Sequence, residues 1–423
     1  MSLILEKIRL VFQDKDLRKR ILFVLLILAL FRLGASIPIP SVDQSRLAEF
    51  FSDNQFFGLL NIFSGGGLSN LSIMMLGVGP FITASIIMQL LTLIFPALKE
   101  LYHEEGETGR RKVTQYSRLL TIPLAIVQGF GLLMLLENEG VLGQIDFTTK
   151  MLSVLIVTAG SILLMWLGEL ISEYGIGNGV SLIIFAGIIS GLPSAVSQLW
   201  VSFTPEQIPI YFGFIIAAAT IIAGVVIMTE AERPVPITYA KRVRGSKIYG
   251  GISTYLPIRV NNAGVMPIIF ALSILLFPQM IINFLARVDN AVIKMVTDFM
   301  LAFLNNVWLY SVFYFVLVVA FTYFYSAVTF DPESIANNLQ KSGAFIPGVR
   351  PGRSTSEYIG RILSRLTLTG AIFLGVVAML PLLMRAATGI TALAIGGTGL
   401  LIVVSVVLDL VKKIDAQVTM RQY

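Results

Sequence analysis

The residues of this chain whose type and spacing best suit a chemical contact are basic, and Arg350 is the clearest of them. It lies between the dipeptides Pro347-Gly348 and Pro351-Gly352. Pro and Gly in this arrangement predict a tight turn, so we expect the backbone of Arg350 to be fixed. A guanidinium presented in this way suits contact with a carboxylate or a phosphate. The surface that it contacts could therefore belong to an acidic protein or to RNA.

A second basic stretch, from Ala240 to Lys247, contains Lys241, Arg242 and Arg244. Its charge would suit a binding surface. It would equally suit the topology signal that cytoplasmic loops of membrane proteins carry. The residues alone leave both interpretations open.

Residue types that support metal binding or covalent catalysis are scarce. The chain has no cysteine, and its single histidine, His103, lies in a charged stretch. Zinc sites draw on several His or Cys ligands. The glycine-rich stretch from Ser64 to Asn70 lacks the Gly-Lys-Ser/Thr ending of a phosphate-binding loop and predicts a flexible segment instead. We therefore expect no enzymatic activity, no metal and no cofactor.

The long apolar stretches also lack the acidic residues that ion-coupled transporters and intramembrane aspartyl proteases need. Gln89 and Gln128 are uncharged, while Arg32 and Asp409 lie near the ends of their stretches. A charge inside a membrane span costs roughly 2.5–3.5 kcal/mol on insertion scales and usually marks an ion or proton pathway. The absence of charged residues inside the apolar stretches favours a pore or a scaffold with an apolar interior. Loss of water from such an interior can close a pore.

The elements that must position these residues are membrane-spanning helices. Apolar residues make up 56% of the chain and charged residues 13%, about half the charge of a typical soluble domain. A helix needs ~20 mostly apolar residues to cross a bilayer, and the sequence offers ten such runs. They lie at about 19–37, 71–97, 117–136, 151–171, 177–200, 208–229, 263–285, 307–330, 366–385 and 390–411.

The distribution of Lys and Arg predicts the orientation. With both termini in the cytoplasm, 25 of the 31 basic residues fall on the cytoplasmic side, as the positive-inside rule requires. The first run follows several basic residues, but Ser36-Ile37-Pro38 is a poor cleavage site, so we expect a retained anchor rather than a signal peptide.

The runs also predict two halves of five helices, residues 1–200 and 201–423. Each half starts with one helix, a long polar segment and a helix interrupted by Gly and Pro. Because five is odd, the second half must be inverted relative to the first. Inverted repeats place the functional path between the halves, and the interrupted helices point to it. The interruptions are Gly77, Gly79 and Pro80 in the second run and Gly264 and Pro267 in the seventh.

From end to end, the chain resembles the SecY family, the channel subunits of the bacterial Sec translocon. Each motif alone is weak, but their order and spacing together are specific. The motifs are Phe31-Arg32-Leu33-Gly34, Ile37-Pro38-Ile39-Pro40, Phe63-Ser64-Gly65-Gly66, Ile82-Thr83-Ala84-Ser85-Ile86-Ile87 with Gln89-Leu90-Leu91, Gly109-Arg110-Arg111-Lys112, Gly175-Ile176-Gly177-Asn178-Gly179, Tyr239-Ala240-Lys241-Arg242, Asn262-Ala263-Gly264-Val265-Met266-Pro267 and the run from Lys341 to Gly352.

The resemblance implies an all-α clamshell of two five-helix halves around a pore through which unfolded proteins cross the bacterial cytoplasmic membrane. A ring of aliphatic side chains would close its waist, and a plug at about 60–71 would block the external funnel. By motif position, the ring is Val78, Ile82, Val180, Ile184, Ile269 and Ile402. The plug residues are Asn61, Phe63, Gly65, Gly66, Leu68 and Leu71.

The resemblance also implies a lateral gate between the second and seventh helices, through which transmembrane segments reach the lipid bilayer. Thr83, Gln89, Asn262 and Phe277 would lie at this gate. Implied partners are the subunits SecE and SecG, signal sequences and nascent chains, and the SecA motor or the ribosome. The motor or ribosome would bind the cytoplasmic loops at about 230–262 and 331–365, through Lys241, Arg242, Arg244 and above all Arg350.

Two other classes compete with a passive protein-conducting channel. One is a secondary transporter of a small solute, which the missing buried acids disfavour and which solute uptake into vesicles would detect. The other is a membrane scaffold without a pore, which ion conductance after disturbing the waist would distinguish.

Overall fold

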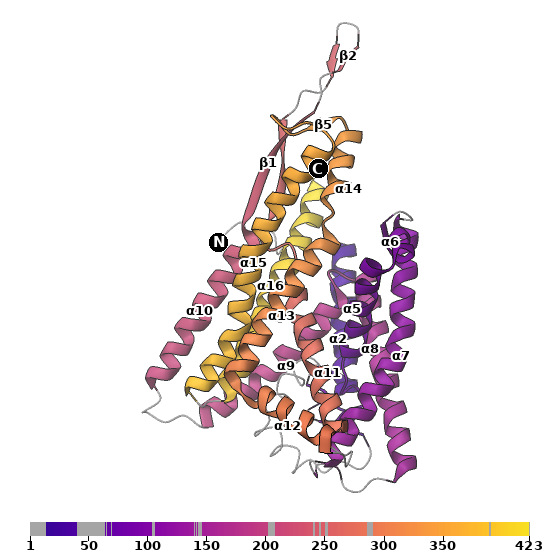
Figure 1. Ribbon diagram of the computed structural model, residues 1–423, viewed down its shortest axis with the longest axis vertical. Coiled ribbons are helices and arrows are strands. Elements are labelled where there is room, and N and C mark those ends of the chain that lie inside the picture. The colour runs from indigo at the N-terminus through magenta and orange to yellow at the C-terminus, as the bar shows by residue number, and fades with distance from the viewer. Residues whose placement is uncertain are drawn as a thin grey trace.

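The computed structural model is a bundle of long helices with a small β-sheet at one end (Figure 1). It describes residues 14–39, 64, 66–68, 70–103, 106–138, 140, 142, 146–201, 208–239, 242–244, 247–249, 253–285, 291–388 and 391–422.

Each of the ten predicted runs corresponds to one long helix, in the same order. By length and hydropathy, five helices in the described part of the chain could cross a membrane, and a bent pair, α5 with α6, makes a sixth. The helix of the first run, α2, carries several charges besides its apolar residues. The ten helices are α2 (Lys15–Ala35), α5 (Gly79–Ile94), α7 (Gly106–Asn138), α8 (Phe147–Tyr174), α9 (Gly179–Val201), α10 (Ile208–Glu230), α11 (Met266–Leu285), α13 (Val307–Thr329), α15 (Arg353–Thr388) and α16 (Thr391–Gln422).

Local sequence explains where several of these helices begin and end. The Asp14 side chain accepts hydrogen bonds from the backbone N–H groups of Asp16 and Leu17, and Asn306 caps α13 in the same way. Such caps satisfy donors that a helix start leaves open. The second run breaks at Phe95, which is extended because Pro96 follows it. The chain then turns by 110° into α6 (Pro96–His103).

The structure corrects several predicted boundaries. Residues 71–78 form turns rather than the first part of a helix, and Gly77 has φ 58°, a left-handed conformation that Gly adopts without strain. The fifth run forms one helix, α9, which continues through Pro193. The ninth helix begins earlier than predicted, at Arg353 rather than near 366.

Two polar loops come together in one small sheet, which the sequence did not predict. The strands are β1 (Glu232–Tyr239), β4 (Ser253–Arg259) and β5 (Ala344–Phe345), in the order β4-β1-β5 and all antiparallel. Val235 and Ile237 alternate inward along β1 and cluster with Ile359 and Leu363 of α15. We call this body, with α14 (Pro332–Lys341), the platform. Beyond it stands a hairpin of β2 (Arg242–Arg244) and β3 (Lys247–Tyr249).

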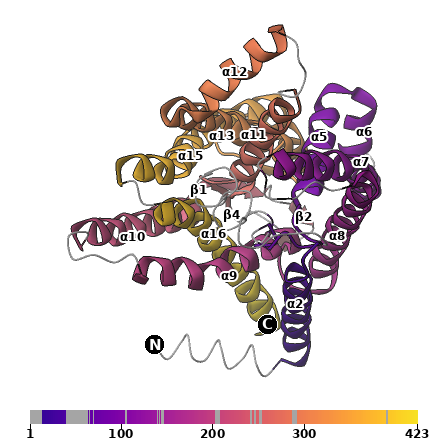
Figure 2. The ribbon, with the colours of Figure 1, turned by 90° about the horizontal axis from the view of Figure 1, so that it is seen from below.

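The helices before residue 202 meet those after residue 207 along two main contacts. On one side, α11 packs against α5 and α7; on the other, α16 packs against α9. Figure 2 shows the bundle along its long axis. The largest hydrophobic cluster draws side chains from both sets of helices, so the contact between the sets is part of the apolar core.

Small residues on α8 make room for the turns at residues 71–78. Gly160 lies against the backbone of Ile73, where a Cβ atom on Gly160 would collide with the Ile73 carbonyl. The adjacent Ser161 hydroxyl donates to the Gly77 carbonyl at 3.0 Å. Non-helical backbone is tolerated at membrane depth only where protein groups satisfy it. Gly160 and Ser161 therefore permit the break that precedes α5.

This close approach predicts that Gly160→Ala destabilises the protein. The added methyl group must push the Ile73 carbonyl away, and overpacking of this kind costs about 1–3 kcal/mol. We expect a lower midpoint of thermal unfolding in detergent, followed by fluorescence-detected size exclusion. Gly213→Ala on α10 is the matched control, because nothing lies within 4 Å of its added Cβ. Equal midpoints for both variants would contradict this account of α8.

Candidate functional site

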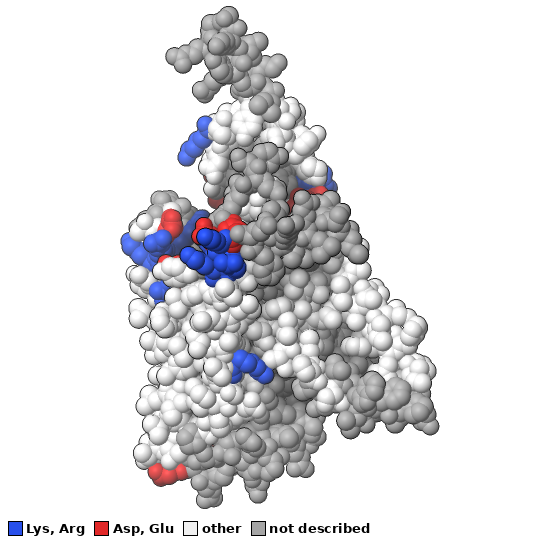
Figure 3. Space-filling view, turned by 180° about the vertical axis from the view of Figure 1, so that it is seen from behind, with Lys and Arg blue, Asp and Glu red and all other residues white. Residues whose placement is uncertain are grey.

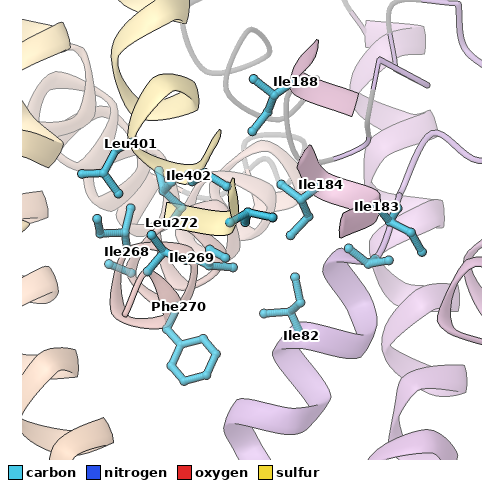
Figure 4. Close-up of a cluster of buried hydrophobic side chains, with 14 of the residues drawn as sticks. Ile82, Ile183, Ile184, Ile188, Ile268, Ile269, Phe270, Leu272, Leu401 and Ile402 are labelled. Atoms are coloured by element: carbon cyan, nitrogen blue, oxygen red, sulfur yellow. The ribbon is translucent and has the colours of Figure 1, made fainter. Parts of the chain in front are cut away.

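The six residues predicted to form the waist lie in one hydrophobic cluster supplied by four helices. Five are buried there, at exposed fractions of 0–3%: Val78, Ile82, Ile184, Ile269 and Ile402. Val180 is partly buried and packs against the same cluster. Figure 4 shows Ile82, Ile184, Ile269 and Ile402 gathered from α5, α9, α11 and α16.

Five of the six ring positions lie where helices begin, and Ile402 lies farther along α16. Val78 precedes α5, and its carbonyl accepts from the N–H of Ile82 at 3.0 Å, which puts the two side chains one turn apart on one face. Val180 and Ile184 have the same spacing at the start of α9. Ile269 lies in the first turn of α11. The breaks in the helices therefore set the level of the ring.

Ile188 is a neighbour of the ring that sequence reasoning missed. It lies one turn beyond Ile184 on α9, and its side chain would be 3.0 Å from a Cβ atom placed on Gly399. Gly399 precedes Ile402 by one turn on α16. This close approach of α9 and α16 brings Ile402 to the cluster. The only sequence signal was a glycine pair at 396–397 and a third glycine at 399.

The six residues predicted to form the ring are all aliphatic, and none of them carries a charge. Among the described residues, the buried polar side chains are Ser, Thr, Asn and Gln. An aliphatic constriction of this kind excludes water and ions without any charge. Its chemistry supports a seal rather than a coordination site.

The described part of the predicted plug packs in a hydrophobic cluster other than that of the ring. Ser64, Leu68 and Leu71 are buried, and the Ser64 hydroxyl accepts from the Leu68 N–H at 3.0 Å. Leu68 and Leu71 join a second hydrophobic cluster with residues of α7 and α8. Gly66 has φ 80°, and a Cβ there would lie 3.3 Å from the Arg32 guanidinium of α2. Asn61, Phe63 and Gly65 lie outside the described residues.

The predicted gate residues lie on or beside the two helices that meet at the first main contact. Thr83 of α5 is buried, and its hydroxyl donates to the Gly79 carbonyl. Gln89 is partly buried, and its Oε1 has no hydrogen-bond partner among the described residues; the same holds for Nδ2 of Asn262. Phe277 belongs to α11, but its side chain lies outside the described residues.

An unsatisfied buried polar atom costs about 1–3 kcal/mol. Gln89 belongs to α5 and Asn262 precedes α11, so one such atom lies on or beside each of these two helices. Both helices also begin in the same way, because Gly77 and Gly264 have left-handed backbones and Pro80 and Pro267 follow in the first turn.

Arg350 lies on the platform in the tight turn that the sequence predicted. Gly348 has φ 82° and Gly352 has φ 98°, and the Thr355 hydroxyl donates to the Arg350 carbonyl at 2.9 Å. The Arg350 side chain is exposed, and no described carboxylate pairs with it. Arg353, in contrast, pairs with Glu357 at 3.3 Å. The fold thus presents the Arg350 guanidinium from a fixed backbone.

The other predicted basic contacts are less well defined. Arg242 and Arg244 lie on β2, where Arg244 is opposite Lys247 of β3, but their side chains are outside the described residues, as is all of Lys241. In the view of Figure 3, most of the described Lys and Arg side chains lie toward the platform end, together with Asp and Glu. The described surface farther from the platform is mostly uncharged, as lipid contact requires.

Comparisons with known proteins agree with this geometry. A family model described as SecY matches residues 72–411. The protein translocase subunit SecY of Streptomyces coelicolor is 42% identical over 435 residues, which cover 97% of each chain. That of Corynebacterium glutamicum is 41% identical, again over 97% of each.

Solved structures are similar in fold. A protein-conducting channel matches with a TM-score of 0.63 at 20% identity, covering 93% of this chain and 91% of the other. Sec61 in a canine ribosome–channel complex matches with a TM-score of 0.59, also at 20% identity and with the same coverage of each chain.

The ring geometry predicts that Ile402→Asn opens a leak. An amide in the constriction offers hydrogen bonds to water and so lowers the dewetting barrier. We expect a measurable ion conductance in planar bilayers where the unaltered protein is tight.

Ile402→Leu keeps the side chain aliphatic and serves as the control, with conductance near that of the unaltered protein. If the Asn variant folds and stays as tight as the Leu variant, Ile402 is an ordinary core residue and does not contribute to a seal.

Proposed function

Because the chain belongs to the SecY family, we propose that it forms the protein-conducting channel of a translocase and is not itself an enzyme. In this proposal, unfolded secretory proteins pass through the bundle, and transmembrane segments leave it sideways into lipid. The chain is a multi-pass membrane protein, and we place it in the bacterial cytoplasmic membrane.

The observation that carries the proposal is the aliphatic ring. Side chains from four helices, two in each half of the sequence, meet in one cluster free of charge. A solute carrier would need polar groups at this point to bind its cargo and coupling ion. A flexible aliphatic ring can instead widen around an extended polypeptide and close again without a specific binding site.

We assign the closed-state seal to the ring and the plug together. The two halves, residues 1–200 and 201–423, act as the two sides of a clamshell. Leu68 and Leu71 are held by α7 and α8, so the plug would belong to the first half. Removing the plug from the external funnel would then leave the ring as the remaining barrier.

The lateral gate is the contact of α11 with α5 and α7. Two observations support this choice over the contact of α16 with α9. The first is that Gln89 of α5 and Asn262, just before α11, each have a buried polar atom without a hydrogen-bond partner among the described residues. The second is that α5 and α11 begin with matching Gly and Pro breaks. A contact that is less favourable when closed needs less energy to open.

A disulfide across this contact should lock the gate. In the double variant Thr83→Cys, Phe277→Cys, mild oxidation should form a bond, which needs Cα atoms within about 7 Å. The bond should stop both export and membrane insertion, and reduction should restore them.

Each single variant is the control and should remain active. The natural chain has no cysteine, so no other pairing within this chain can interfere. A bond that forms and leaves both activities intact would remove the lateral opening from the mechanism.

We propose that the platform faces the cytoplasm and binds the energising partner, either the SecA motor or a ribosome. Arg350 is the central contact, and the hairpin with Lys241, Arg242 and Arg244 adds a second basic point. SecE and SecG are the expected companion subunits. Copurification from native membranes would identify which of these partners are present.

Charge reversal tests the contact at Arg350. Arg350→Glu should reduce motor-dependent export severely while the amount of inserted protein stays unchanged, because the side chain is exposed and its role is a charge contact. Arg353→Glu is the matched control and should do less, since Arg353 already pairs with Glu357. Equal, mild effects of both would indicate that the loop carries topology charge alone.

The same position reports the orientation. Arg350→Cys should react with an impermeant maleimide only after the cells are permeabilised. Reaction in intact cells would place the platform outside and would overturn the assignment of partners.

A further inference from the structure

The helix α12 (Ala291–Asn305) lies between α11 and α13 in the sequence and contacts both. It lies at the end of the bundle opposite the platform (Figure 1), and it runs outward from the bundle across the direction of the long helices (Figure 2). It is too short to cross a bilayer, which needs ~20 residues. The function proposed above gives this helix no role.

One side of α12 is an exposed apolar stripe. Val292, Met295 and Phe299 are each at least 70% exposed, and Val296 and Met300 are also exposed. Their spacing of three and four residues puts all five on one face of the helix. The two charged residues, Lys294 and Asp298, lie one turn apart on the opposite face.

The stripe is continuous with the apolar surface of α13. At the end of α12, the ring of Phe303 packs edge-on against Phe313, with centroids 5.6 Å apart. On α13 itself, Trp308, Val312 and Val316 are exposed and recur every four residues along one side of this apolar helix. An exposed apolar side on a membrane-spanning helix suits contact with lipid, so its continuation along α12 points to the same partner.

We propose that α12 is an interfacial anchor that lies in the headgroup region of the external leaflet, with its apolar stripe among the upper acyl chains. A short helix with one apolar and one charged face binds in the plane of a membrane surface. Trp308 begins α13 at the same end, where aromatic residues mark the membrane–water boundary. The leaflet rests on the proposed orientation; the contact with lipid does not.

A fluorescent label tests the anchor directly, because the chain has no cysteine of its own. Met295→Cys on the stripe and Asp298→Cys on the charged face form a matched pair, and each is labelled with an NBD maleimide. The protein, with the subunits that copurify with it, is reconstituted into vesicles of phosphatidylethanolamine and phosphatidylglycerol. Quenching is measured with aqueous iodide and with lipids that carry a nitroxide near the headgroup or deep in the chain.

We expect the label at Met295 to emit at a shorter wavelength than the label at Asp298. The shallow nitroxide should quench the Met295 label several-fold more than the deep nitroxide does, and iodide should quench it little. The Asp298 label should show the reverse preference between iodide and lipid. Iodide quenching of the Met295 label equal to that of the Asp298 label would overturn the anchor. A Met295 label that neither iodide nor the nitroxide lipids quench would also overturn the anchor, because it would mean that protein covers the stripe.

Translocation measured in the same vesicles separates this proposal from the proposed function. Active vesicles with a water-exposed Met295 label would reject the anchor and leave the channel intact. A lipid-exposed label in vesicles that cannot translocate under any condition would support the anchor and count against the channel.

Discussion

The architecture depends on satisfying a stretch of non-helical backbone inside a membrane-spanning bundle. Residues 71–78 cannot hydrogen-bond to lipid, so every polar group needs a protein partner. The Ile39 N–H donates to the Leu71 carbonyl, and the Ile73 N–H donates to the Ile37 carbonyl. The Ser161 hydroxyl donates to the Gly77 carbonyl. Because this backbone is satisfied, α5 can start in the interior, and Val78 and Ile82 reach the ring rather than the surface.

The sequence predicted the helices well because a helix that crosses a bilayer needs ~20 mostly apolar residues. Each of the ten apolar runs corresponds to a long helix in the described part of the chain, in the same order, and the backbone breaks near Gly77 and Gly264 as predicted. The helix α9 continues through Pro193. A proline costs less in a membrane helix whose neighbours can satisfy the freed carbonyl. The ring residues came from family resemblance, because aliphatic side chains in a seal and in a core look alike in sequence.

Two features had signals too weak to find by pattern. The sheet pairs β1 with β5, more than a hundred residues away, and β5 is only two residues long, so no periodicity could reveal it. The amphipathic helix α12 lies in what hydropathy describes only as a loop between spans. Its apolar residues follow a helical spacing, but the helix is shorter than a membrane span. The division into spans therefore assigned it to the loop between the seventh and eighth runs. Interfacial helices are easily lost when a sequence is divided into spans and loops alone.

The platform connects three long helices, α10, α11 and α15, at one end of the bundle. Strand β1 follows α10 after a single residue, β4 leads through a short turn into α11, and α15 starts within the same small core. A load applied at the exposed turn before α15 is therefore shared among three helices instead of bending one. Because these three helices share one small core at the platform, a displacement of the platform moves them together. Such a displacement reaches α11 through the fold itself.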